Sequence, residues 1–199
     1  MSLTFDADTH TYRWNGRVTP SVTQILKPLT DFSSVPPDVL AAASAFGTAV
    51  HKCCELNDLG TLDESCLDPA LVPYLKAWRN FSADHAVKWS HIEKPLHSGM
   101  GFCGTADRFG IVDGQLSVVD IKSTAAIYPA VGLQLAAYQR LGLDNGIVSV
   151  NRYAVRLQGN GSYELQPFIR PTDLSVFASL LSLRNWCVKH NVTPNFSQE

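Results

Sequence analysis

The chain contains 199 residues, of which 45% are hydrophobic and 17% are charged, and this is the balance of a folded globular protein. No apolar run approaches the roughly 20 residues that span a bilayer, and the N-terminus lacks the charged and apolar segments of a secretory signal, so we expect a cytoplasmic protein without membrane contact. The net charge of −2 is low for a protein that binds polyanions through Lys and Arg alone.

The first part of the chain indicates a hairpin followed by a short helix. Apolar residues alternate between residues 3 and 14, and Asn15-Gly16 is a strong hairpin-turn signal. Ser21 is a suitable cap for a helix over residues 22–26, and three prolines within residues 28–37 predict a loop. We therefore expect residues 1–37 to form an N-terminal extension.

The rest of the chain alternates between helical and extended patterns. The expected helices span residues 38–58, 70–85, 129–143 and 172–190, the last capped by Thr172, and the expected strands span residues 87–97, 102–112, 115–122, 147–157 and 162–169. This order predicts an α/β fold in which a mixed central β-sheet is flanked by helices. We expect one domain over residues 1–199, with a core at 38–145, C-terminal strands and a helix at 146–199, and a loose tail from 191.

Four short motifs follow one another along the chain. They are Gly47-Thr48-Ala49-Val50-His51, Gly104-Thr105-Ala106-Asp107, Asp120-Ile121-Lys122 and the pair Gln134 and Tyr138. On a strand, Asp120 and Lys122 project to one side and Ile121 to the other. A carboxylate and an ammonium on the same side can hold a divalent cation and steady a water beside it.

The turn at residues 112–115 places Asp107 and Asp120 on adjacent strands. Two carboxylates side by side repel each other, and a divalent cation relieves the repulsion. Helical residues four apart share a face, so Gln134 and Tyr138 lie together, as do His51 and Glu55. The remaining histidines show no ligand spacing, and we expect them to be structural: His10, His85, His91, His97 and His190.

This ordered set resembles the PD-(D/E)XK nuclease superfamily in its RecB-like branch, over roughly residues 45–140. The segment from Tyr12 to Thr23 also looks like the start of phage-type exonucleases. The resemblance implies a restriction-endonuclease-like core and a Mg²⁺- or Mn²⁺-dependent DNA exonuclease that acts on free DNA ends in phage recombination or DNA repair, in the host cytoplasm if phage-encoded. Ala106 stands where many superfamily members have proline, a departure that RecB-like members commonly share.

The resemblance also implies a role for each motif residue. The implied metal ligands are His51, Asp107, Asp120 and the backbone carbonyl of Ile121, and the implied catalytic residues are Asp107, Asp120, Lys122, Gln134, Tyr138 and Glu93. Gln134 and Tyr138 would orient Lys122, which would position the attacking water or stabilise the transition state. An iron–sulfur cluster, which some relatives hold with three late cysteines, cannot be built, because only Cys187 lies in the last third of the chain.

Plainer interpretations and other functions stay open. The motif charges could belong to a solvated strand edge, and His51 could be an ordinary core histidine. The chain could also be a restriction-type endonuclease or a non-catalytic DNA-binding or assembly protein, and a homo-oligomer or a recombination partner such as a single-strand annealing protein is compatible with the sequence. Despite the negative net charge, we expect a local basic groove formed from Lys76, Arg79, Lys88, Lys94, Arg152, Arg156 and Arg170.

Overall fold

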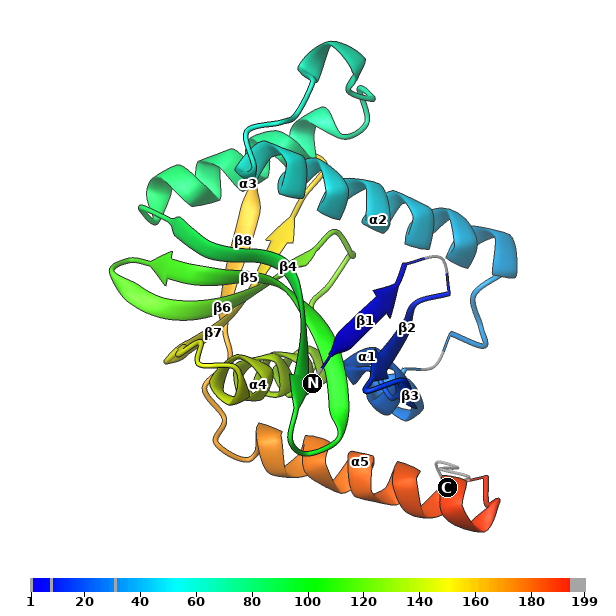
Figure 1. Cartoon of the computed structure of the whole chain (residues 1–199). Coiled ribbons are helices and arrows are strands. Elements are labelled where there is room, and N and C mark those ends of the chain that lie inside the picture. Colours follow the sequence, from blue (N-terminus) through cyan, green and yellow to red (C-terminus); the bar gives the residue numbers. More distant parts are fainter. Residues whose placement is uncertain (1, 8, 31, 194–199) are drawn as a thin grey trace.

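The computed structural model describes residues 2–7, 9–30 and 32–193, so residues 194–199 of the expected loose tail lie outside it. The fold is α/β, with a mixed central sheet flanked by helices on both faces and a separate N-terminal sheet (Figure 1). This confirms the fold class that the order of patterns predicts. No helix in the described ranges is both long and apolar enough to cross a membrane.

The N-terminal sheet has three antiparallel strands, β1 (Leu3–Asp6), β2 (Thr11–Trp14) and β3 (Arg17–Thr19). The Asn15-Gly16 turn joins β2 to β3, as its sequence predicts, and both turn residues have positive φ angles. The expected hairpin is therefore part of a sheet with one further strand.

The central sheet has the order β4-β5-β6-β7-β8. Its strands are β4 (Lys88–Ser98), β5 (Phe102–Val112), β6 (Gln115–Lys122), β7 (Asn151–Leu157) and β8 (Tyr163–Pro167). Only β6 and β7 pair in parallel, and the helix α4 (Ala130–Asp144) connects them. A parallel pair requires such a crossover, whereas the antiparallel neighbours are joined by short turns.

The two faces of this sheet carry separate apolar cores. One face packs on α2 (Pro37–Asp58) and α3 (Val72–Asp84), and Val119 and Ile121 point into that core. The other face packs on α1 (Val22–Leu26), α4 and α5 (Asp173–His190), and Val118 points there. Because successive strand residues alternate faces, Asp120 and Lys122 share the α4 side of β6 with Val118.

Three contacts attach the N-terminal sheet to the β4–β5 hairpin. Trp14 stacks on His97 with ring centroids 3.9 Å apart. The hydroxyl groups of Tyr12 and Thr105 are hydrogen-bonded at 2.8 Å. Ser21 forms a β-bridge with Cys103, and its side chain completes a capping box with Gln24 at the start of α1, which confirms the predicted cap.

The structure differs from the sequence-based expectation at a few element ends. β7 begins at residue 151 rather than 147, and a turn of 3₁₀ helix at Lys27–Leu29 extends into the predicted loop at 28–37. A second 3₁₀ turn, Glu64–Cys66, lies between α2 and α3. The prediction that Thr172 caps α5 is wrong, because it precedes the helix in a helical conformation and its side chain makes no capping hydrogen bond. A cap requires an extended backbone that aims the hydroxyl at the first turn.

Gly110 is a point where β4 and β5 approach too closely for a side chain. A Cβ atom there would lie 2.3 Å from the Lys88 carbonyl oxygen and 2.8 Å from the Trp89 Cα, so β4 would have to move. We expect Gly110→Ala to lower the free energy of unfolding by at least about 1–3 kcal/mol in urea titrations. Gly99→Ala is the matched control, because its Cβ would meet no atom within 4 Å, and an equal effect of both variants would contradict this packing.

Candidate functional site

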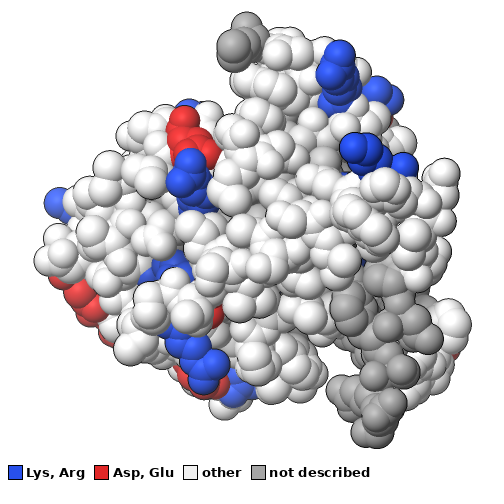
Figure 2. Space-filling model, turned by 90° about the horizontal axis from the view of Figure 1, so that it is seen from below, with Lys and Arg blue, Asp and Glu red and all other residues white. Residues whose placement is uncertain are grey.

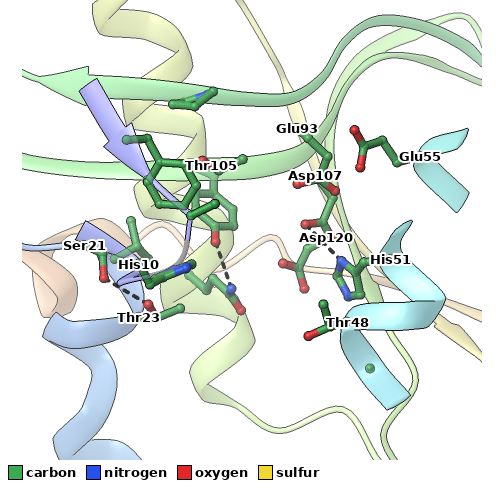
Figure 3. A pocket seen from close by; sticks show the side chains of 18 of the residues that line it. His10, Ser21, Thr23, Thr48, His51, Glu55, Glu93, Thr105, Asp107 and Asp120 are labelled. Atoms are coloured by element: carbon green, nitrogen blue, oxygen red, sulfur yellow. Dashed lines mark hydrogen bonds and ion pairs between the residues drawn. The ribbon is translucent and has the colours of Figure 1, made fainter. Parts of the chain in front are cut away.

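A cavity of about 650 Å³ lies where the stretch of α2 from Ser44 to Glu55, the strands β1 and β2, and the central sheet meet. All four sequence motifs contribute to its lining. Figure 3 shows His10, Ser21, Thr23 and Thr105 on one side, and Thr48, His51, Glu55, Glu93, Asp107 and Asp120 on the other. Segments that are far apart in the sequence therefore converge on one space.

Three side chains form a compact group of metal-ligand type in this cavity. One ligand atom from each of His51, Glu93 and Asp107 lies within 4.8 Å of the others. His51 Nδ1 is 3.4 Å from Asp107 Oδ1. The group is assembled from α2, β4 and β5, and the side chain of Asp107 is only 8% exposed. Such a set of imidazole and carboxylate groups around a common space is the chemistry that binds a divalent cation.

Asp107 also holds β6 in place. Its Oδ2 atom accepts a hydrogen bond of 2.6 Å from the backbone N–H of Ile121. The β5–β6 ladder ends at the pair Arg108 and Val119, so beyond this point the Asp107 side chain makes the bond to β6. The prediction that Asp107 and Asp120 lie on adjacent strands is confirmed.

A second group continues the site toward α4. Lys122 Nζ lies 2.6 Å from Asp120 Oδ2 and donates a hydrogen bond of 3.0 Å to Gln134 Oε1, while Gln134 Nε2 donates one of 3.1 Å to the Tyr138 hydroxyl. Burial disfavours the ammonium, but Asp120 and Asp107 outweigh it and raise the pKa of Lys122. Lys122 is therefore a fixed positive charge rather than a proton acceptor.

Arg108 supports the site from below. Its guanidinium is fully buried, donates from Nε to Asp58 Oδ2 at 2.7 Å, and lies 3.2 Å from Glu93 Oε1. It also donates to the Asp107 carbonyl oxygen at 2.6 Å and covers the Trp78 ring, whose indole N–H donates to Asp58. The buried Arg108 guanidinium, which Asp58 and the Asp107 carbonyl oxygen hold in place, thus holds the side chain of Glu93 toward the cavity.

Local sequence choices permit this close assembly. A Cβ at Gly47 would lie 3.5 Å from Ser123 Oγ, an ordinary van der Waals distance, so the approach of α2 to the segment after β6 does not itself require glycine. A Cβ at Gly104 would lie 2.9 Å from side-chain atoms of Val22 and Leu141 and 3.1 Å from the Tyr138 ring. Glu93 has a φ angle of 45°, an uncommon conformation for glutamate that interrupts the regular strand where its side chain meets the cluster.

The crowded carboxylates shift the pKa values around them. Burial lowers the pKa of His51, but the negative charges nearby, with Asp107 the largest, outweigh burial and raise it to about 9. Burial and the charge of Asp107 raise the pKa of Glu93 to about 8. Burial favours neutral Asp107, yet His51 and Lys122 lower its pKa, whereas burial raises the pKa of Asp120. At neutral pH the metal-free cluster therefore carries protons on His51 and Glu93.

The donor set fits a divalent metal ion. Two carboxylates and one imidazole supply oxygen and nitrogen ligands, and a cation between them removes the repulsion that protons otherwise relieve. Asp120 Oδ2 is buried, and the ammonium of Lys122, 2.6 Å away, compensates its charge.

The structure brings together every side chain that the sequence nominates for the site. His51, Glu93, Asp107, Asp120, Lys122, Gln134 and Tyr138 all line the cavity. Glu93, which the resemblance nominates as a catalytic residue, lies among the groups that can hold the metal. Asp120, which it nominates as a metal ligand, pairs with Lys122. The Ile121 carbonyl as a metal ligand stays a prediction. Glu55 lines the cavity but pairs with Lys52 at 2.9 Å.

Two groups of residues that the sequence left outside the site differ in their relation to the cavity. The seven basic residues expected to form a groove do not line the cavity, and three of them are paired with acids: Arg79 with Glu64, Arg152 with Asp173 and Arg156 with Glu164. Conversely, His10 lines the cavity although its spacing gave no signal, because it comes close only through the pairing of β1 with β2.

Comparisons with known proteins give similarities to solved structures only. No protein-family model and no curated protein matches the chain. The alkaline exonuclease LHK-Exo from Laribacter hongkongensis is 12% identical, with a TM-score of 0.43 and coverage of 86% of this chain and 94% of that one. A presumed exonuclease from Eubacterium rectale is 9% identical, with a TM-score of 0.43 and coverage of 77% of both chains. SSO0001 is 15% identical, with a TM-score of 0.37 and coverage of 75% and 77%.

These similarities are too weak to assign a function, since the identities are low and every TM-score is below 0.5. Functional conclusions must come from the residues of the cavity itself.

The shifted pKa values predict how metal affinity depends on pH. A cation must displace the protons of His51 and Glu93, whose pKa values of about 9 and about 8 exceed their usual ones. We expect the affinity for Mn²⁺ to rise between about pH 6 and pH 9, with proton release detected by calorimetry in buffers of different ionisation enthalpy. His51→Ala should release about one proton fewer, and an affinity independent of pH would contradict the assignment.

Proposed function

We propose that the chain is a metal-dependent deoxyribonuclease that hydrolyses phosphodiester bonds from DNA ends. The observation that carries the proposal is the meeting, in one cavity, of the His51–Glu93–Asp107 group with the chain of contacts from Asp120 through Lys122 to Gln134. The four motifs that resemble the RecB-like nucleases supply these residues, except Glu93, in the order that the resemblance requires.

The His51–Glu93–Asp107 group would hold the metal, with Asp120 beside it. A bound Mg²⁺ or Mn²⁺ polarises the phosphate and lowers the pKa of water. The imidazole favours Mn²⁺, since Mg²⁺ prefers oxygen ligands throughout. Asp120 Oδ2, which lies 2.6 Å from Lys122 Nζ, would fix that ammonium beside the attacking water.

Lys122 has the task of stabilising charge. Its ammonium is fixed between Asp120 and the Gln134 amide, and the Tyr138 hydroxyl fixes that amide in turn. A charge held in place before the reaction stabilises the extra negative charge that a phosphate acquires as water attacks. Because Lys122 remains protonated, it acts by electrostatics and not as the general base.

Two other functions would use the same fold. A restriction-type endonuclease would need an element that reads base edges, and the described chain beyond the site consists of β7, β8 and α5. A non-catalytic DNA-binding protein would have no use for a complete set of carboxylates and lysine.

The proposed role lies in phage recombination or DNA repair, with a single-strand annealing protein as a partner and a ring of several copies as one arrangement.

Lys122→Ala should abolish cleavage while Mn²⁺ binding persists. The ammonium contacts the reacting phosphate and is not a ligand, so we expect a loss of roughly 3–4 kcal/mol of transition-state stabilisation, or about 100- to 1000-fold in kcat. Steady-state cleavage and calorimetry measure the two properties separately. Lys88→Ala, which removes an exposed lysine at the start of β4, is the control. Cleavage within about tenfold of wild type would remove Lys122 from the reaction.

Cleavage should require a free DNA end. The cavity has few basic residues and the net charge is −2, so tight binding to duplex DNA through phosphates is not available. A DNA end that is threaded into the cavity is retained because the cavity walls enclose it, and this retention takes the place of affinity for the phosphates. We expect linear DNA to be degraded progressively with Mn²⁺, whereas a covalently closed circle survives. Rapid conversion of the circle to linear DNA would favour the endonuclease.

A further inference from the structure

The wall of the cavity opposite α2 is aromatic. Phe5 on β1 stacks on Tyr12 on β2 with ring centroids 4.5 Å apart and planes inclined by 30°. The His10 ring stands edge-on to both, at 5.3 Å from Phe5 and 6.0 Å from Tyr12. All three line the cavity. Tyr12 is buried and fixed by its bond to Thr105, whereas Phe5 is half-buried and His10 is exposed.

From this wall, we propose that the cavity takes a single-stranded DNA end whose bases stack on Phe5 and His10. This inference rests on the proposed function and specifies its substrate. Aromatic side chains stack on bases of any sequence, because every base has a flat π-face. Base-tolerant stacking is what a nuclease that degrades DNA progressively requires, since it meets every sequence in turn.

The charges in the cavity favour stacking over phosphate binding. Four basic side chains line the cavity within the described ranges: Lys52, Lys122, His51 and His10 of the aromatic wall. Lys52 is paired with Glu55, so it is not a free partner for a phosphate, and Lys122 is fixed beside Asp120, where it serves the one phosphate that reacts. On the face of the molecule that carries α5, Lys and Arg side chains stand in small separate groups, some of them beside acidic residues (Figure 2). Affinity for DNA must therefore come largely from the bases and the metal.

The opposite wall suits the sugar–phosphate backbone. Ser44, Thr48 and His51 recur every three or four residues along α2, so they share one face of the helix and line the cavity. Figure 3 shows Thr48 and His51 facing the space across which His10 lies. A strand between the two walls would place its bases against the rings and its phosphates against the Ser44 hydroxyl and the metal that His51, Glu93 and Asp107 would hold. In duplex DNA the base faces are covered by neighbouring pairs, so an unpaired end fits this arrangement.

The test is a comparison of kcat/KM on single-stranded oligonucleotides with normal or abasic residues at the cleaved end, in Mn²⁺. For Phe5→Leu and His10→Ala we expect a loss of roughly 5- to 150-fold on the normal end, and a much smaller loss on the abasic end, where no base is present to stack. Phe5→Trp should restore most of the loss. Phe32→Leu is the matched control, because Phe32 is 50% exposed and lies outside the cavity lining.

Equal losses on normal and abasic ends would show that the rings act only through the fold, and no loss on either would show that they do not contact the substrate; both results overturn the inference. A blunt duplex cleaved as fast as the single strand also overturns it.

If wild-type protein cleaves nothing, the proposed function fails, and fluorescence of a terminal 2-aminopurine in EDTA still decides the stacking. Quenching by wild type that Phe5→Leu removes supports stacking, and fluorescence unchanged by wild type contradicts it.

Discussion

The crowding of three buried or half-buried carboxylates is the constraint on which the rest of the structure depends. Isolated charges of one sign are costly in a protein interior unless cations or protons compensate them. The carboxylates are those of Glu93, Asp107 and Asp120, and the compensating groups are His51, Lys122 and Arg108. Each compensating group comes from a different element, so the elements must be packed correctly before the charges balance. A metal ion would take over part of this compensation, which ties metal binding to folding.

Arg108 shows how the fold meets this demand. The guanidinium is fully buried, and its partners Asp58, Trp78 and Glu93 come from α2, α3 and β4. A buried ion pair contributes little net stability relative to apolar packing, but the loss of one member is severe, because the other charges are left without a partner. Arg108 is therefore best understood as the group that fixes where Glu93 points, rather than as a source of stability.

The sequence was sufficient where short-range patterns determine the answer. Alternation placed Asp120 and Lys122 on one face of β6, and the turn at 112–115 set β5 beside β6. Patterns could not reveal that Glu93 joins His51 and Asp107, because this depends on a positive φ angle within β4 and on the burial of Arg108. Nor does the sequence show that none of the seven basic residues lines the cavity, or that Arg79, Arg152 and Arg156 are each paired with a carboxylate.

The carboxylate of Asp107 has two roles: it attaches β6 to β5, and it belongs to the group that can hold the metal. One carboxylate oxygen accepts the Ile121 N–H and so replaces the ladder bond where β5 and β6 separate, while the other faces His51. The residue that ties β6 to β5 beyond the end of the ladder is thus also one that can hold the metal. Because Ile121 lies between Asp120 and Lys122, the same hydrogen bond fixes the position of both, and a shift of β6 along β5 would disperse the whole site.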